Sequence, residues 1–179
     1  MLDLGAGNGR DTVFLLSQGF RVRYVDISAE AVDHTREQLR AGGLASDRVS
    51  VECGDVLSVD ERDGGVHGAV LIGVVNSLTR QAAQELFARL RRWMAPGGIV
   101  MITVPLTPQA EPTDDEPEFD YTYAPGSLPD DFPGWRIHLH EEKRGKAFWV
   151  CLFVAEKPKE HDAEALEQGG IRAHQQRTG

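Results

Sequence analysis

The sequence predicts an α/β fold with a doubly wound, mostly parallel sheet that finishes in an antiparallel hairpin. Short apolar, β-branched runs alternate with helical patterns as far as Val104. A glycine-rich turn, Gly5–Gly9, joins the first apolar run to the first helical pattern. Near the C-terminus, two strand-like runs, Trp135–Glu142 and Lys146–Glu156, are separated only by a short turn at residues 143–145. Neighbouring strands with so short a connection must pair antiparallel.

In the first half of the chain, strands are expected where apolar runs occur: Met1–Leu4, Arg21–Val25 and Arg48–Cys53. The first helix is expected over Arg10–Gln18, with Gly19 ending it. Ser28 is expected to cap a second helix that runs to about Ala41. Ile27 and Val32 lie at hydrophobic staple positions on either side of this cap.

In the second half, two further strands are expected over Val66–Ile72 and Ile99–Val104. The latter is nearly all apolar, which is typical of a strand covered on both faces. The clearest helix is Thr79–Met94, and Pro96–Gly98 is expected to form a tight turn after it. Its apolar residues recur at helical spacing on one face: Ala83, Leu86, Phe87, Leu90, Trp93 and Met94.

The domain is expected to extend over residues 1–157. Thr107–Asp120 is rich in proline and acidic residues, lacks periodicity and is predicted to be a surface loop. Its acidic run fits a solvated loop better than a lid that attracts a cationic acceptor. Pro158–Gly179 is polar and is predicted to be a disordered tail. Met1–Leu4 is too short for an ordinary central strand, so we expect the N-terminal part of the fold to be truncated.

Composition limits the function classes. The chain has 179 residues, 41% of them hydrophobic, which suffices for one domain with a core. A formal net charge of −9 without a basic stripe argues against nucleic acid and against an anionic membrane surface as partners. No apolar run reaches membrane-spanning length, and no secretory signal is recognised. Cys53 and Cys151 lie far apart and predict no metal or disulfide framework, which favours a reducing, cytoplasmic location.

A strand, a glycine turn and a helix start form a site for a nucleotide-like ligand, because glycine lets backbone approach the ligand and the helix start offers free N–H groups. The spacing here is G-x-G-x-G with Asp3 before it, whereas dinucleotide enzymes use G-x-G-x-x-G. Asp26 ends the second strand and can accept hydrogen bonds from both ribose hydroxyls. The alternative is that Asp26 caps the next helix, but Ser28 already has that role. Asp55 can accept from an adenine amino group, with Val56 against the ring, or be an ordinary turn aspartate.

Taken together, these motifs resemble the class I S-adenosylmethionine-dependent methyltransferases. The matching segments, in chain order, are LDLGAGNGRD, YVDIS, CGDV, HGAVLIGVV and LRRWMAPGGIVMITV. The segment GNGRDTVFLLSQGFRVRYVDISAEAV and the C-terminal layout around EFDYTYAPGSLPDDFPGWRIHLHEE are similar to the tellurite-resistance-type subgroup. The resemblance implies a Rossmann-like sheet, S-adenosylmethionine as cofactor, and methyl transfer to a small-molecule acceptor. It does not transfer tellurite as the substrate.

The resemblance and the turn chemistry give the expected cofactor-binding residues: Asp3, Gly5, Ala6, Gly7, Asn8, Gly9, Arg10, Asp26, Ile27, Asp55, Val56 and Gly73. For the acceptor, Asn76 follows the fourth strand and is either a site residue or the start of the next helix. Tyr121 and Tyr123 are either pocket walls or core residues. His138 and His140 alternate on one strand, and without a third ligand at a supporting spacing we expect no metal site.

No catalytic residue is assigned, because a soft nucleophile attacking an activated methyl group needs no base, whereas an oxygen or nitrogen acceptor can need one. Two other function classes stay open. A non-catalytic cofactor-binding module would keep Asp26 and Asp55 but lack a closed acceptor pocket. A nicotinamide-dependent oxidoreductase would need the longer glycine spacing, which the turn lacks.

Overall fold

The computed structural model of the chain describes residues 1–106, 122–144 and 149–159. The predicted acidic loop, Tyr121, the hairpin turn and the tail beyond residue 159 lie outside these residues. The strands are β1 Leu2–Leu4, β2 Val22–Asp26, β3 Val49–Cys53, β4 Val66–Leu71, β5 Met94–Leu106, β6 Arg136–Arg144 and β7 Trp149–Glu156. The helices are α1 Arg10–Ser17, α2 Ala29–Ala41 and α3 Arg80–Trp93, with 3₁₀ turns η1 Val56–Ser58, η2 Val75–Ser77 and η3 Leu128–Asp131.

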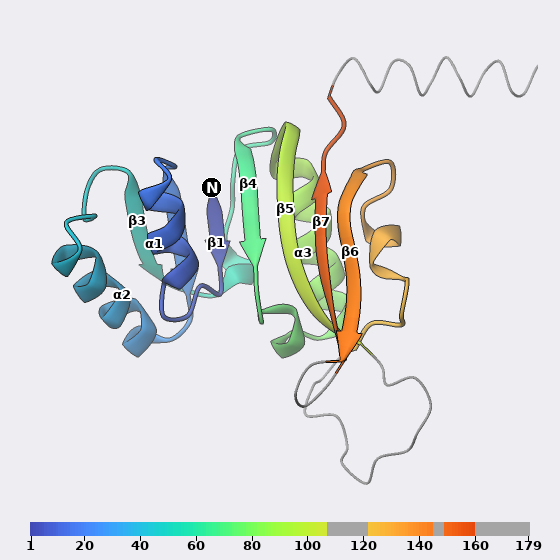
Figure 1. The fold of residues 1–179 in the computed structure, drawn as a ribbon, viewed down its shortest axis with the longest axis horizontal. Coiled ribbons are helices and arrows are strands. Elements are labelled where there is room, and N and C mark those ends of the chain that lie inside the picture. Colours follow the sequence, from blue (N-terminus) through green and yellow to red (C-terminus); the bar gives the residue numbers. More distant parts are fainter. Residues whose placement is uncertain (107–121, 145–148, 160–179) are drawn as a thin grey trace, which may run out of the picture.

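The strands form one seven-stranded sheet in the order β3-β2-β1-β4-β5-β7-β6. The pairs β1–β2, β1–β4, β2–β3 and β4–β5 are parallel, whereas β7 pairs antiparallel with both β5 and β6. The predicted fold class and its C-terminal hairpin are therefore confirmed. Short as it is, β1 lies at the centre of the sheet (Figure 1), and its carboxyl end points to the same edge as that of β4.

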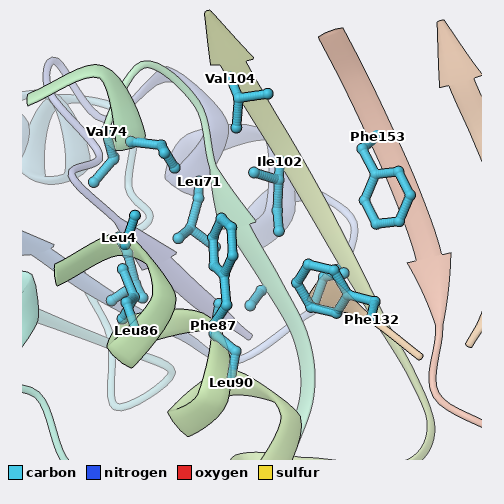
Figure 2. Packing of buried hydrophobic residues seen from close by; sticks show 14 of the residues in the cluster. Leu4, Leu71, Val74, Leu86, Phe87, Leu90, Ile102, Val104, Phe132 and Phe153 are labelled. Atoms are coloured by element: carbon cyan, nitrogen blue, oxygen red, sulfur yellow. The ribbon is translucent and has the colours of Figure 1, made fainter. Parts of the chain in front are cut away.

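Helices pack on both faces of the sheet, as alternation along β4 shows. Val70 belongs to a cluster with Leu15 of α1 and Leu39 of α2. Its neighbours Ala69 and Leu71 belong to the larger cluster, which includes α3. Figure 2 shows the centre of this larger cluster, where α3 side chains meet those of β1, β4, β5 and β7. All six residues predicted for the buried stripe of the third helix are fully buried.

Helix starts follow the local sequence. The Ser28 hydroxyl accepts from the Ala31 N–H at 3.2 Å, so the predicted cap of α2 is confirmed. The Thr79 hydroxyl caps α3 through the Ala82 N–H at the same distance. The predicted hydrophobic staple is wrong in one half, because Val32 is buried but Ile27 is 75% exposed.

The start of β5 differs from the prediction. Pro96–Gly98 was expected to be a turn before the strand, but the strand already begins at Met94, which pairs with Val66. Pairing then jumps to Gly68 and Ile99, and an irregular segment with Gly97 at φ 76° lies between the two pairs. The expectation that both faces of this strand are covered holds only in part. Met101 packs against the cluster that contains α1 and α2 side chains, whereas Ile99 is 43% exposed.

The chain after β7 is tied to the end of α3. The Lys157 ammonium donates to the carbonyls of Arg91 at 2.8 Å and Met94 at 2.7 Å. The Lys157 backbone N–H donates to the Gly98 carbonyl at 2.9 Å. Within the described residues, no helix is both long and apolar enough to cross a membrane. The domain boundary at residue 157 stays a prediction.

Candidate functional site

The glycine turn after β1 has a conformation that only glycine adopts easily. Gly5, Gly7 and Gly9 have φ values of 64°, 52° and 71°. A Cβ on Gly5 would lie 2.2 Å from a methyl group of Val74, and one on Gly9 would lie 2.5 Å from Thr35. A Cβ on Gly7 would meet nothing within 4 Å. Gly5 and Gly9 are therefore needed for packing, whereas Gly7 leaves open space in front of its backbone, where a ligand can approach.

Asp26 holds this turn from the neighbouring strand. One carboxylate oxygen accepts from the Gly7 N–H at 2.7 Å, and the other accepts from the Ser28 N–H at 2.8 Å. The side chain is 9% exposed at the carboxyl end of β2. The cap of α2 itself is Ser28, so Asp26 braces the residue before the helix and does not cap it. Each oxygen still has a second lone pair for a ligand hydroxyl, so these two hydrogen bonds are compatible with ligand binding.

Asp3 supports the turn from the interior. Its carboxylate accepts from the Thr12 hydroxyl at 2.5 Å, which ties β1 to α1, and it is 2% exposed. Burial raises the pKa of Asp3 to about 6, against the opposing effect of the Thr12 hydrogen bond. Direct contact between Asp3 and the cofactor stays a prediction.

Sequence reasoning missed two side chains that fix the same turn. The Tyr24 hydroxyl donates to the Gly7 carbonyl at 2.6 Å, and the Thr35 hydroxyl lies 3.4 Å from the same oxygen. Both residues are fully buried. The sequence signals that could have found them are a tyrosine, Tyr24, inside an apolar strand and a threonine, Thr35, on the buried face of α2. Both hydroxyls, together with Asp26, hold the two peptide groups on either side of Gly7.

The other predicted cofactor residues lie after the carboxyl ends of neighbouring strands, at the lower edge of the sheet in Figure 1. Ile27 is exposed beside Asp26. Asp55 is exposed and caps η1 through the Leu57 N–H at 2.8 Å, which is the turn role that the sequence left open. Val56 is 7% exposed and packs in the core, and its contact with the adenine ring stays a prediction.

The predicted acceptor-side residues have different surroundings. Asn76 lies in η2, after β4, and is half-buried. The Gly73 N–H donates to the Thr103 hydroxyl at 3.0 Å, which fixes the start of this loop against β5. Tyr123 is 2% exposed, with its ring 6.3 Å from that of Phe87, so the core alternative holds for it. Tyr121 lies outside the described residues.

The two histidines of β6 have different partners. His138 Nε2 lies 2.8 Å from a Glu156 oxygen, whereas His140 Nε2 lies 3.0 Å from a Glu142 oxygen. A register shift between Ile137 and Leu139 separates the two positions. Regular alternation, on which the predicted shared face depended, is interrupted by this shift.

Comparison with known proteins agrees with the geometry of the site. Residues 1–98 match the family described as "Methyltransferase domain". No curated protein sequence matches the chain.

Solved structures share the fold at low sequence identity. TehB from Haemophilus influenzae superposes with a TM-score of 0.76 at 20% identity, covering 87% of this chain and 56% of TehB. The [4+2]-cyclase SpnF gives 0.73 at 17% identity, covering 88% and 74% of the two chains. The 1,6-didemethyltoxoflavin-N1-methyltransferase of Burkholderia thailandensis, with S-adenosylhomocysteine bound, gives 0.66 at 23% identity, covering 88% and 70%. The chain thus spans little more than half the length of TehB.

Proposed function

Because this chain belongs to the methyltransferase-domain family, we propose that it transfers a methyl group from S-adenosylmethionine to a small-molecule acceptor. One observation carries the proposal. Asp26 and Tyr24 hold the backbone N–H and the carbonyl of Gly7, with open space at its Cβ position, at the edge where β1, β2 and β4 end. In doubly wound sheets, ligands bind at this edge, where the order of strands reverses.

The start of α1 suits the amino-acid end of the cofactor. Its N-cap is Gly9, which has no side chain to satisfy the first N–H groups of the helix. The starts of α2 and α3 are capped by Ser28 and Thr79. Unused donors and the positive end of the helix dipole favour a carboxylate at the Gly5–Gly9 turn.

Asp26 and the residues around it suit the nucleoside part. Its carboxylate can accept ribose hydroxyls, and hydrogen bonds to a charged group contribute about 1.5–3 kcal/mol each. Ile27 is exposed beside it and offers apolar surface to the adenine ring. Asp55 can accept from the adenine amino group, because a carboxylate has acceptor sites beyond the one used to cap η1. The remaining expected contacts, from Ala6, Asn8, Arg10 and Gly73, are part of the same proposal.

Bound S-adenosylmethionine supplies a sulfonium-activated methyl group. The residues of this chain then have to position the acceptor in line with that methyl group, and orientation alone can account for about 7–11 kcal/mol of the barrier. Asn76 is the described residue best placed to orient an acceptor, because it follows β4 beside the proposed cofactor edge. Two proteins of similar fold support a small acceptor, since they are methyltransferases of 1,6-didemethyltoxoflavin and of magnesium protoporphyrin IX. A cytoplasmic location is part of the proposal.

Calorimetric titration of S-adenosylhomocysteine tests the cofactor site. Gly7→Ala places a methyl group in the proposed ligand space and is expected to weaken binding by at least about tenfold, which is 1.4 kcal/mol. Gly43→Ala is the matched control, because Gly43 also has a positive φ and an open Cβ position but lies in the turn after α2. Equal binding by wild type and Gly7→Ala would refute the proposed site.

A second arm separates the alternatives. Tight binding of S-adenosylhomocysteine, without methylation of any acceptor in a small-molecule panel, would favour a non-catalytic binding module. Binding of NADH in place of S-adenosylhomocysteine would favour an oxidoreductase. Methylation of a panel member, lost in Gly7→Ala, is the result that the proposal expects.

A further inference from the structure

Three potential metal ligands of different chemistry converge on the C-terminal hairpin. His140 and Glu142 lie on β6, and Cys151 lies on β7 directly opposite Glu142 in the strand register. Their ligand atoms, one nitrogen, one carboxylate oxygen and one sulfur, all lie within 4.8 Å of one another. Ligand atoms around a tetrahedral zinc ion are separated by roughly 3.5 Å, given metal–ligand bonds of about 2.0–2.3 Å. Small side-chain adjustments therefore suffice to close the cluster on an ion.

The surroundings hold the cluster in place. The Gly126 N–H donates to Glu142 Oε1 at 2.6 Å, which orients the carboxylate. The His140 ring packs edge-on against Phe153, at 6.1 Å between centroids and 83° between planes. Outer contacts of this kind orient metal ligands in known sites.

Charge and access also fit a divalent transition metal. A thiolate from Cys151 and the Glu142 carboxylate together balance a charge of +2, and neutral His140 adds none. Cys151 is fully buried, whereas the side chains of His140 and Glu142 are each 25% exposed. The partly exposed side chains of His140 and Glu142 give the ion an entry path. Sulfur and imidazole favour zinc over magnesium or calcium.

We propose that His140, Glu142 and Cys151 form a binding site for a divalent transition metal, zinc above all, with one coordination position open to water or a small ligand. On binding, the Cys151 thiol releases its proton to solvent and the sulfur bonds to the metal. This inference does not rest on the proposed methyl transfer.

A second histidine–glutamate pair on the same hairpin serves as an internal control for the proposed site. His138 and Glu156 are as close as His140 and Glu142, at 2.8 Å and 3.0 Å. Among the residues that the structure describes, only the group with His140 includes a third potential ligand. His138 is therefore a matched control on the same strand, and the exposed Cys53 is a matched control for the thiol.

Cobalt(II) titration of the reduced, chelator-treated full chain tests the site, because cobalt replaces zinc and a cobalt–thiolate bond gives a near-ultraviolet charge-transfer band. We expect this band to saturate at one cobalt per chain and to disappear when zinc is added. Cys151→Ser should abolish the band, and His140→Gln should weaken cobalt binding by at least about tenfold. His138→Gln and Cys53→Ser should leave the titration unchanged.

Two results would overturn the proposal: the absence of the band in folded wild type, or a band that persists in Cys151→Ser. Circular dichroism of each variant shows whether it is folded. Should Cys151→Ser fail to fold, His140→Gln decides, because His140 lies on the exposed edge strand. Wild-type binding by His140→Gln would then reject the site. The calorimetric titration with S-adenosylhomocysteine has a separate readout, so failure of one proposal is distinguishable from failure of the other.

Discussion

Asp3 makes stability depend on pH at the scale of a single residue. Its pKa is raised from 3.8 to about 6 in the folded chain, so the folded state holds a proton that the unfolded state has lost between these values. The free energy of unfolding should therefore fall by up to about 3 kcal/mol as pH rises from 4 to above 6, and stay at the lower value beyond.

Asp3→Asn removes this titration while keeping a hydrogen-bonding partner for Thr12. Urea denaturation between pH 4.5 and 7.5 should show a flatter profile for Asp3→Asn than for wild type. Asp63→Asn, at an exposed residue paired with Arg92, is the control and should keep the wild-type slope. Parallel profiles for wild type and Asp3→Asn would show that the buried carboxylate does not titrate in this range.

Gly5 tests whether packing, as well as conformation, selects glycine in the turn. Gly5→Ala should destabilise the fold by about 1–3 kcal/mol more than Gly7→Ala, because only the Gly5 Cβ meets Val74. In a double-mutant cycle, Val74→Ala should recover part of this difference, with a coupling energy of at least about 0.5 kcal/mol. Thermal unfolding of the four proteins measures it, and strict additivity would contradict the contact.

Elements whose boundaries depend on neighbouring residues in the sequence were predictable. Elements whose boundaries depend on pairing with residues far away in the sequence were not. The caps of α2 and α3 depend on Ser28 and Thr79 bonding to an N–H three residues ahead, which is legible in the sequence. The start of β5 depends on Met94 pairing with Val66, which no local pattern around Pro96–Gly98 reveals. The same holds for the site. The Asp26 position was predictable from the end of β2, but its bond to Gly7 requires two strands to be in register.

Lys157 acts at the scale of elements, by joining the end of β7 to the end of α3. Lys157→Met keeps most of the apolar stem but loses the hydrogen bonds to the Arg91 carbonyl in α3 and to the Met94 carbonyl at the start of β5, so it should lower stability by about 1–3 kcal/mol. Lys143→Met is the control, since Lys143 is exposed and its ammonium meets the exposed Glu141 carboxylate at 3.4 Å. Chemical denaturation should separate the two variants, and equal midpoints would show that the connection is not stabilising.

Over the whole molecule, the two cysteines report on opposite regions of the sheet. Cys53 is exposed at the carboxyl end of β3, paired in register with Asp26 at the proposed cofactor edge. Cys151 is buried, and burial, with the nearby Glu142 charge, raises the pKa of its thiol to about 12. In the folded, metal-free chain near pH 8, the exposed Cys53 should therefore react readily with iodoacetamide. The buried Cys151 should react slowly, because the thiolate is the reactive form. In denaturant both should react.

The cofactor should change this pattern at one end of the sheet only. Saturating S-adenosylhomocysteine is expected to slow alkylation of Cys53, because an adenosine held by Asp26 covers the neighbouring strand end. It should leave Cys151 unchanged, and Gly7→Ala should remove the protection of Cys53 at the same ligand concentration. Peptide mass spectrometry after timed alkylation distinguishes the two thiols. Unprotected Cys53 at saturation would place the ligand away from the β2–β3 edge, whereas protection of both thiols would point to a general tightening of the fold and not to a local contact.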